Sequence, residues 1–490
     1  MRQLTGLDAT YLALDSATVV SHLGCVCVID PASRGEVLSL QSLTELVESK
    51  LDLLPPFRQR LAEVPLGLDQ PYWIEDRHFT IDSHVREWVL PAPGGDHELA
   101  EQAARLHEKP LDRARPLWEM HLIHGLAAGK QAVYIKVHHA AIDGVAGTNL
   151  LGALLDPAPR PVSMPTVPAW RPDAEPTRMR LLARSVASAA RQPIRLTRLS
   201  VDLLRLARVL ANSHARPQLP VIDRLFRCRM PEATQLGTPL LAPRTPFNTM
   251  LGPGRRWAFG SLPIRSVQQI RDRAGGTVND VVMALCAGAL REWLADHGAL
   301  PAGPLLAGVP VSCRTDQHTA THGNTLSKIV APLPTHLSEP AERLRAVRTA
   351  MDAAKDQFHS APTDVLTAIA ACAVPAVANR VSRLANRIRL LERLRPLNLF
   401  ISNVPGPPVR MYLGGAYVDA VYPLSTIADG QGLNITVMGS QGTLTFGILA
   451  DPEQVPDVGA IRDGLVSELA LLYEAVVGTT ADLQRHECPA

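Results

Sequence analysis

The chain has 490 residues and a mass of 53.0 kDa, more than one compact core usually holds, so two or three lobes are expected. Hydrophobic residues make up 46% of the chain and charged residues 20%, and this balance excludes wholesale disorder. The 49 Lys and Arg residues nearly match the 47 Asp and Glu residues. The resulting net charge of +2 does not supply the strong basic field that nucleic-acid binding requires over a whole chain.

The sequence also limits where the protein works. Its 7 cysteines are odd in number, widely spaced and without a CxxC pair, which argues against a zinc ribbon and against a secreted disulfide framework. Asp8 and Asp15 interrupt the N-terminal stretch where a signal peptide would be apolar, and no uncharged apolar run reaches the ~18 residues that span a bilayer. A cytoplasmic protein without a membrane-spanning segment is therefore expected.

Residues 1–156 are expected to form a first lobe of mixed α/β structure. The β-branched run at residues 22–30 and the alternating run at 132–138 predict strands, and residues 40–54 have helical spacing. Seven of the twenty residues from 157 to 176 are prolines, a density that helices and central strands do not tolerate. This run predicts an extended connector that ends the first lobe.

The connector, residues 157–240, also contains a predicted helix at 178–210 with a break at Pro193. The second half of this helix has leucines around most of its circumference and arginines at spacings of three, four and seven. The arginines are Arg191, Arg195, Arg198, Arg205 and Arg208. A basic amphipathic helix is expected. Two interpretations stay open: a solvated polar face on a helix docked against the protein, or a helix lying on an anionic membrane surface.

Residues 241–490 are expected to form the second lobe. Residues 277–293 predict a helix, with Thr277 as its N-cap and Asp280 as the acidic partner of a capping box. The other predicted elements are two buried strands at 305–311 and 399–402, a hairpin of 433–438 with 443–449, and a C-terminal amphipathic helix at 461–476. Two mixed α/β lobes joined by a proline-rich connector follow from this pattern.

The most informative motif is HHAAIDG, residues 138–144. Side chains alternate between the two faces of a strand, so His139 shares a face with Ile135 and Val137, while His138 shares the other face with Lys136. This disfavours a metal site of two histidines and Asp143, because the two imidazoles do not converge. Two interpretations remain: ordinary structural histidines, or a general base at a strand end whose loop is held by Asp143 in an Asp-Gly turn before a helix at 145–155.

The motif resembles the HHxxxDG signature of the CoA-dependent acyltransferase superfamily. Six further segments resemble one branch of it, the bacterial wax ester synthase/diacylglycerol acyltransferases, and they occur in the order of that family. They are PPFR (55–58), PLWE (116–119), Asn279-Asp280, VPVSCR (309–314), SNVPGP (402–407) and GLNITVM (432–438). The connector matches nothing specific in the family.

The resemblance implies an α/β (α+β) fold of two chloramphenicol-acetyltransferase-like lobes, with mixed sheets and an active-site tunnel between them. It implies that His139 is the general base, that His138 has an orienting or packing role, and that Asp143 fixes the loop by pairing with a cation. Trp118 of PLWE is expected to pack in the core. The candidate substrate or oxyanion groups are Asn279, Asp280, Asn403, Gly144 and Arg314, of which Arg314 is also the candidate partner of Asp143.

The implied function is O-acyl transfer from acyl-CoA to diacylglycerol or to a long-chain alcohol. Acyl-CoA is expected as a substrate, with no cofactor and no metal. The expected partners are a lipid alcohol acceptor and the surface of a membrane or lipid droplet, which the cytoplasmic protein would contact peripherally. The alternatives are an acyltransferase of the same fold that esterifies another lipid or a polyketide alcohol, and a non-catalytic lipid-binding protein.

Overall fold

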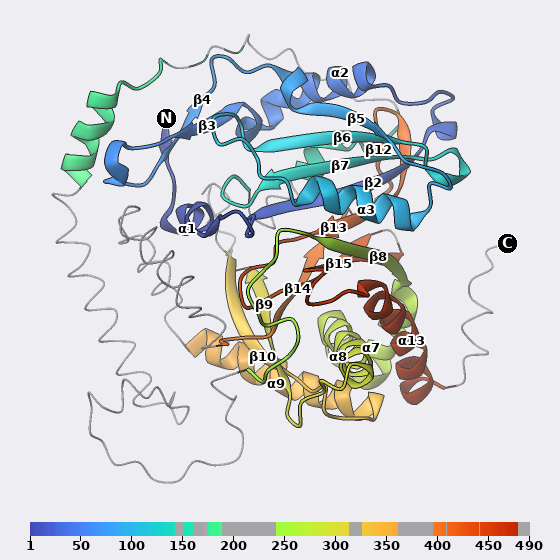
Figure 1. The fold of residues 1–490 in the computed structure, drawn as a ribbon. Coiled ribbons are helices and arrows are strands. Elements are labelled where there is room, and N and C mark those ends of the chain that lie inside the picture. The colour runs from blue at the N-terminus through green and yellow to red at the C-terminus, as the bar shows by residue number, and fades with distance from the viewer. Residues whose placement is uncertain are drawn as a thin grey trace, which may run out of the picture.

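The computed structural model describes residues 1–142, 150–159, 170, 172, 174–188, 242–312, 326–360, 395–407, 409–440 and 442–478. Two six-stranded mixed sheets make up most of this structure, and Figure 1 shows them one above the other. A small third sheet joins β1 (Arg2–Gln3), β4 (Tyr72–Glu75) and β3 (Gln59–Ala62). The two-lobed α/β fold predicted from the sequence is confirmed.

The first sheet has the order β12-β13-β2-β7-β6-β5. Its strands are β2 (His22–Asp30), β5 (Val85–Val89), β6 (Trp118–His124), β7 (Gln131–His138), β12 (Tyr412–Leu413) and β13 (Ala416–Leu424). Its helices are α1 (Gly6–Leu14), α2 (Leu40–Lys50) and α3 (Asp96–His107). The helix predicted over 40–54 ends at Lys50 and passes into a 3₁₀ turn at Leu51–Leu53, because Pro55 and Pro56 cannot continue an α-helix.

The second sheet has the order β10-β9-β11-β14-β15-β8. Its strands are β8 (Arg256–Pro263), β9 (Leu305–Ser312), β10 (Leu326–Leu333), β11 (Leu399–Pro405), β14 (Leu433–Ser440) and β15 (Thr443–Ala450). The predicted hairpin is confirmed, since β14 and β15 pair antiparallel along their whole length. Strand β11 runs parallel to both of its neighbours, β9 and β14.

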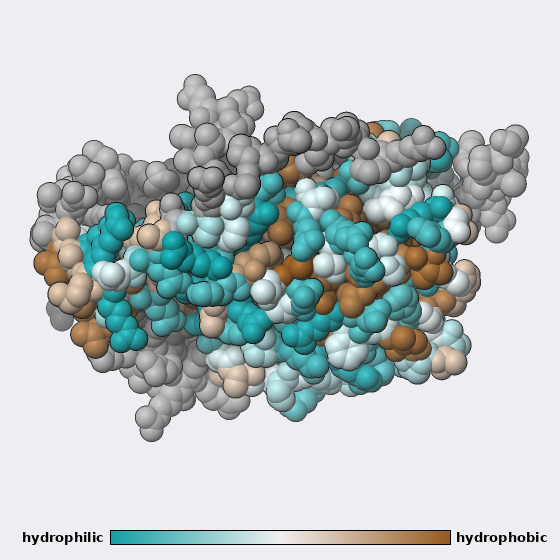
Figure 2. Space-filling model, turned by 90° about the horizontal axis from the view of Figure 1, so that it is seen from above, coloured by the Kyte–Doolittle hydropathy of each residue, from teal (hydrophilic) through white to brown (hydrophobic). Residues whose placement is uncertain are grey.

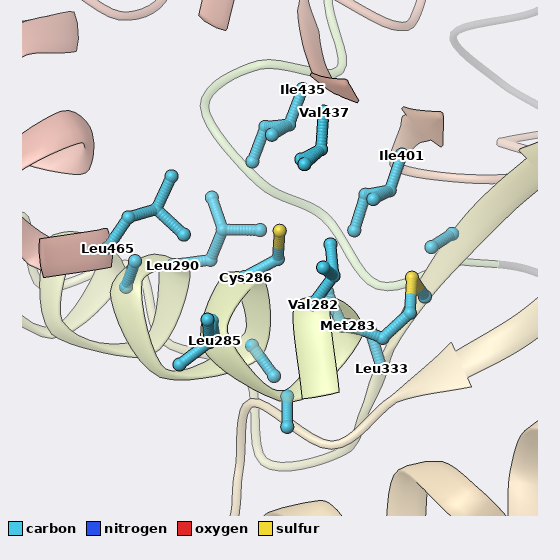
Figure 3. Packing of buried hydrophobic residues seen from close by; sticks show 14 of the residues in the cluster. Val282, Met283, Leu285, Cys286, Leu290, Leu333, Ile401, Ile435, Val437 and Leu465 are labelled. Carbon is cyan, nitrogen blue, oxygen red and sulfur yellow. The ribbon is translucent and has the colours of Figure 1, made fainter. Parts of the chain in front are cut away.

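Four helices cover one face of the second sheet (Figure 1): α7 (Ile264–Ala274), α8 (Val278–Asp296), α9 (Pro340–Ser360) and α13 (Val458–Val476). The predicted capping box starts α8, where Thr277 Oγ1 accepts from the Asp280 backbone N–H and Asp280 Oδ2 accepts from the Thr277 backbone N–H. Figure 3 shows α8 side chains such as Cys286 packed between Ile435 of the sheet and Leu465 of α13. This apolar layer is the largest core among the described residues.

The two sheets are joined by β13, which comes from residue range 241–490 but pairs with β2 in the first sheet. The sequence boundaries of the lobes do not anticipate this crossover, because strand pairing between distant segments leaves no local signal. Against the second sheet, β13 packs closely: Thr445 Oγ1 donates to the Val421 carbonyl at 2.6 Å. A Cβ atom on Gly447 would lie 1.8 Å from the Pro423 carbonyl oxygen, so only glycine permits this approach.

The connector is described only in part. Residues 178–188 are helical, as predicted, and Leu181 of this helix packs against Tyr72 and Ile74 of β4. The basic half of the predicted helix, with Arg191 through Arg208, lies outside the described residues. Within the described ranges, no helix is long and apolar enough to cross a membrane.

Candidate active site

A cavity of about 230 Å³ lies between the two sheets. Both lobes contribute to its wall. The residues from the first lobe are Tyr11, Leu23, Gly24, Cys25, Ile135, Val137, His139, Ile142, Leu150 and Leu151. The residues from the second half of the chain are Pro310, Phe400, Ser402, Asn403, Val404, Pro405, Pro423, Leu424, Ser425, Thr426, Asn434, Thr436 and Met438. Most of this wall is apolar, so the cavity suits a hydrocarbon chain.

His139 is the histidine of this wall, and it directly follows the last residue of β7. Ile135 and Val137 line the same cavity, which confirms the prediction that these three residues share one face of the strand. The His139 side chain is buried, with 7% of its surface exposed, and its ring stacks on Tyr11 with centroids 3.8 Å apart and planes 11° apart. The cavity therefore brings an imidazole and a hydrocarbon-lined space together.

His138 lies on the opposite face of β7, away from the cavity. Its Nδ1 atom accepts the Ala140 backbone N–H at 3.0 Å, so the ring proton resides on Nε2. That Nε2–H donates to Asp15 Oδ2 at 2.9 Å. His138 thus holds the backbone directly after His139 through the N–H of Ala140.

Asp15 is the carboxylate that accepts the hydrogen bond from His138. Burial opposes its ionisation, but hydrogen bonds from His138 and Ser21, together with the nearby Arg113 guanidinium, lower the pKa of Asp15 to about 2. The carboxylate therefore stays charged at every physiological pH. Sequence spacing gives no hint of this pair, because 123 residues separate the two partners.

A layer of buried polar groups continues from His138 along the same face of β7. Lys136 is fully buried, pairs with Glu119 at 2.9 Å and donates to the carbonyls of Leu106 and Lys109 at 2.9 and 3.0 Å. Burial and the nearby Lys136 ammonium lower the pKa of His107 to about 3, so this imidazole is neutral. The strand therefore has an apolar face that lines the cavity on one side and a fixed polar layer on the other.

Two of the family-like motifs meet on the other face of the sheet, where Trp118 pairs in register with Val137. The Phe57 ring of PPFR stacks on the Trp118 ring of PLWE at 4.1 Å, and Trp118 Nε1 donates to the Phe57 carbonyl at 2.9 Å. Only 1% of Trp118 is exposed, which confirms its predicted place in the core. These motifs support the sheet that carries the histidines.

The second lobe lines the cavity opposite the first with strands β11 and β14. Ser402 pairs in register with Thr436, and both line the cavity. Asn403 also borders the cavity, but it pairs in register with Val437. It is two residues from Ile401, which packs in the core against α8, so Asn403 lies on the core-facing side of the strand. Strand alternation thus turns the Ser402 hydroxyl, which was not predicted from the sequence, toward the cavity.

The other candidates lie elsewhere or outside the described residues. Asn279 and Asp280 start α8 and are absent from the cavity wall, and Asp280 is used by the capping box. Asp143, Gly144 and Arg314 fall outside the described part of the chain. In the described ranges, no group of three His, Cys, Asp or Glu side chains is arranged to hold a metal ion.

Comparison with known proteins agrees with this geometry. A family model described as "Wax ester synthase/diacylglycerol acyltransferase catalytic domain" matches residues 4–282, and one described as "WS/DGAT C-terminal domain" matches residues 322–473. A Mycobacterium tuberculosis protein provisionally named a diacylglycerol O-acyltransferase is 36% identical over 97% of this chain and 90% of its own length. A Mycobacterium bovis protein with the same provisional name is 34% identical, over 96% of this chain and 98% of its own length.

Solved structures show the same relationship. The wax ester synthase/diacylglycerol acyltransferase from Marinobacter aquaeolei is 29% identical, covers 96% of this chain and 98% of its own, and superposes with a TM-score of 0.68. The first condensation domain of the CDA synthetase is 17% identical over 98% of both chains with a TM-score of 0.55, a likeness of fold alone. The family model and the relatives together span nearly all of the sequence. The chain therefore belongs to the wax ester synthase/diacylglycerol acyltransferase family, and it is an acyltransferase enzyme.

Proposed function

We propose that this enzyme transfers a long-chain acyl group from acyl-CoA to the hydroxyl of diacylglycerol or of a long-chain alcohol. One observation carries the proposal: the buried imidazole of His139 borders an apolar cavity between the two lobes. A general base in an apolar, water-poor space suits an acceptor hydroxyl on a lipid.

In the proposed reaction, His139 takes the proton of the acceptor hydroxyl while that oxygen attacks the thioester carbonyl. The tetrahedral intermediate then collapses, the carbon–sulfur bond breaks, and the leaving thiolate receives the proton from the imidazolium. The products are an ester and free CoA, and His139 returns to its neutral form. This sequence uses no covalent enzyme intermediate, no metal and no cofactor, since acyl-CoA enters as a substrate.

The oxyanion of that intermediate requires fixed hydrogen-bond donors, each worth about 3 kcal/mol in a water-excluded site. Ser402 of β11 turns its hydroxyl toward the cavity, and Asn403 borders the cavity from the same strand. Asp143 and Arg314 keep their sequence-based roles, fixing the loop after His139, as part of the proposal. Asn279 is the weaker oxyanion candidate, because it does not border the cavity.

The acceptor lipids are insoluble, so we propose that the enzyme collects them at a membrane or lipid-droplet surface. The helix of residues 178–188 supports this, because Met179 and Val186 are 75% and 67% exposed while its Leu181 packs inward. Figure 2 shows hydrophobic residues breaking the hydrophilic surface at the left end of the molecule, the end where this helix lies in Figure 1. Arg178, Arg180 and Arg184 add positive charge to the same helix.

The proposed reaction is tested by measuring CoA release from palmitoyl-CoA. The acceptors are dioleoylglycerol, hexadecanol, a polyketide-like secondary alcohol and buffer alone, each with the wild type and with His139→Ala. Release that depends on dioleoylglycerol or hexadecanol and disappears in the variant is expected. Release with the polyketide-like alcohol alone, or with no acceptor at all, would overturn the acceptor assignment.

A further inference from the structure

We propose that Asp15 is a positioning residue for the base: it acts through His138 and Ser21 to hold the backbone on both sides of His139. The proposal rests on the assignment of His139 as the base. It concerns the segment of residues 11–21. In this segment the Tyr11 ring stacks on the His139 ring, and the Ser21 carbonyl accepts the His139 backbone N–H.

The first route runs through His138. The Asp15 carboxylate accepts the His138 Nε2–H at 2.9 Å, and this fixes the tautomer in which Nδ1 has a free lone pair. That lone pair accepts the backbone N–H of Ala140, the residue directly after the base, at 3.0 Å. Through these two hydrogen bonds, the Asp15 carboxylate holds the backbone that follows His139 in place.

The second route runs through Ser21. The other carboxylate oxygen of Asp15 accepts the Ser21 backbone N–H at 2.9 Å, and the Ser21 carbonyl accepts the backbone N–H of His139 at 2.7 Å. The Ser21 hydroxyl donates to the Tyr11 carbonyl at 3.1 Å, and the Tyr11 ring covers one face of the imidazole. One carboxylate thus joins the two contacts that place the base.

The environment of Asp15 suits this task. Only 17% of its side chain is exposed, and Arg113 at 3.1 Å balances its charge from the outer side. A side-chain amide has one accepting oxygen, so the substitution Asp15→Asn would leave an acceptor for either His138 or Ser21 but not for both. Asp15 itself is not among the residues of the cavity wall.

The test compares Asp15→Ala and Asp15→Asn with a matched control, Asp156→Ala. Asp156 is also in the first lobe, is 16% exposed and pairs with Lys50 at 2.9 Å. With palmitoyl-CoA and the preferred acceptor, Asp15→Ala is expected to lower kcat about 100-fold while KM changes less than about 3-fold, because a small misplacement of the base affects the chemical step rather than binding. The kcat of Asp15→Asn should lie between those of Asp15→Ala and the wild type. Asp15→Glu should recover part of the kcat lost in Asp15→Ala, and Asp156→Ala should keep the kcat of the wild type.

A double variant separates this role from general destabilisation. Because one of the two routes passes through His138, Asp15→Ala should lower kcat by a smaller factor in a His138→Ala background than in the wild type, where both routes are lost. Equal costs in both backgrounds, or a kcat loss in Asp15→Ala no larger than in Asp156→Ala, would overturn the proposal.

A measurement without substrate keeps the proposal separate from the reaction assignment. Hydrogen exchange followed by mass spectrometry should show faster exchange of the peptide containing His139 and Ala140 in Asp15→Ala, and not in Asp156→Ala. Unchanged exchange there would refute the positioning role even if the enzyme is active. If the wild type released no CoA with any acceptor, the proposed function would fail while this exchange experiment still decided the role of Asp15.

Discussion

His138 and His139 are neighbours in the chain, yet their imidazoles lie on opposite faces of β7. His139 borders the cavity between the lobes, and His138 is bound to Asp15 behind the strand. The pair therefore divides into a residue that can meet substrate and a residue that fixes the backbone around it. This division has a direct kinetic consequence.

We expect His139→Ala to lower CoA release by a factor of about 10² to 10⁴, the range that general bases contribute. His138→Ala should keep measurable activity, since the base itself remains in the cavity. Steady-state kinetics on both variants, with folding checked by circular dichroism, tests this. Equal and complete loss of activity in two well-folded variants would contradict the division of roles.

Buried His107 predicts how stability depends on pH. Its Nδ1 lies 2.7 Å from the Tyr134 hydroxyl and its Nε2 lies 2.9 Å from the Ser425 carbonyl, so the neutral ring is fully bonded, and burial lowers its pKa to about 3. The unfolded chain gains a proton at this residue below pH ~6.5, whereas the folded chain does not, so stability falls as pH falls through this window. The expected contribution is about 1.4 kcal/mol per pH unit.

Urea unfolding at pH 7, 6 and 5 measures that slope. His107→Gln should reduce it by about one proton, and His97→Gln, an exposed histidine on the same helix, should leave it unchanged. The window lies above the range in which Asp15 and Glu119, both with pKa values of about 2, lose their stabilising charge. A slope that His107→Gln does not alter would contradict the neutral state of this residue.

The ion pair of buried Lys136 with half-buried Glu119 predicts a stability effect without a direct catalytic one. Lys136→Met removes the cation and leaves Glu119 without its ammonium partner, so the free energy of unfolding should fall by roughly 3 kcal/mol. Adding Glu119→Gln should restore part of the loss, because the uncompensated charge is then absent. Urea unfolding of the single and double variants checks this, and a single variant as stable as the wild type would show that the pair is dispensable.

Gly447 is predicted to control how closely the two sheets approach. In Gly447→Ala the new Cβ atom would meet the Pro423 carbonyl, so β13 must move away from β15, at an expected cost of about 3 kcal/mol. Gly303→Ala is the control, since a Cβ atom there meets nothing within 4 Å. Thermal unfolding of both variants tests this: Gly447→Ala should unfold at a lower temperature than the wild type, and Gly303→Ala should unfold at the same temperature.

The exposed apolar residues of the helix at 178–188 are predicted to contact lipid. Met179→Ser combined with Val186→Ser should reduce co-sedimentation with liposomes of anionic lipid and diacylglycerol, because apolar area is lost from the contact. Val89→Ser is the control, since Val89 on β5 is 75% exposed. Liposome binding that is the same in all three proteins would remove this helix from the proposed lipid surface.

The sequence by itself determined the parts of this protein that depend on local rules. Alternation along residues 132–138 placed His139 with Ile135 and Val137, and the Thr277–Asp280 spacing located the start of α8. The ordered motifs from PPFR to GLNITVM identified the family. These signals are readable because strand alternation, helix capping and short motifs all act within a few residues.

Tertiary structure decided the rest. Asp15 reaches His138 across 123 residues, β13 enters the first sheet from the second half of the chain, and the pairing of Ser402 with Thr436 places both on the cavity wall. None of these contacts has a fixed spacing, because the folded core brings together segments that the chain order keeps apart. A buried histidine on the non-catalytic face requires a polar partner, but only packing selects Asp15 among the 47 acidic residues.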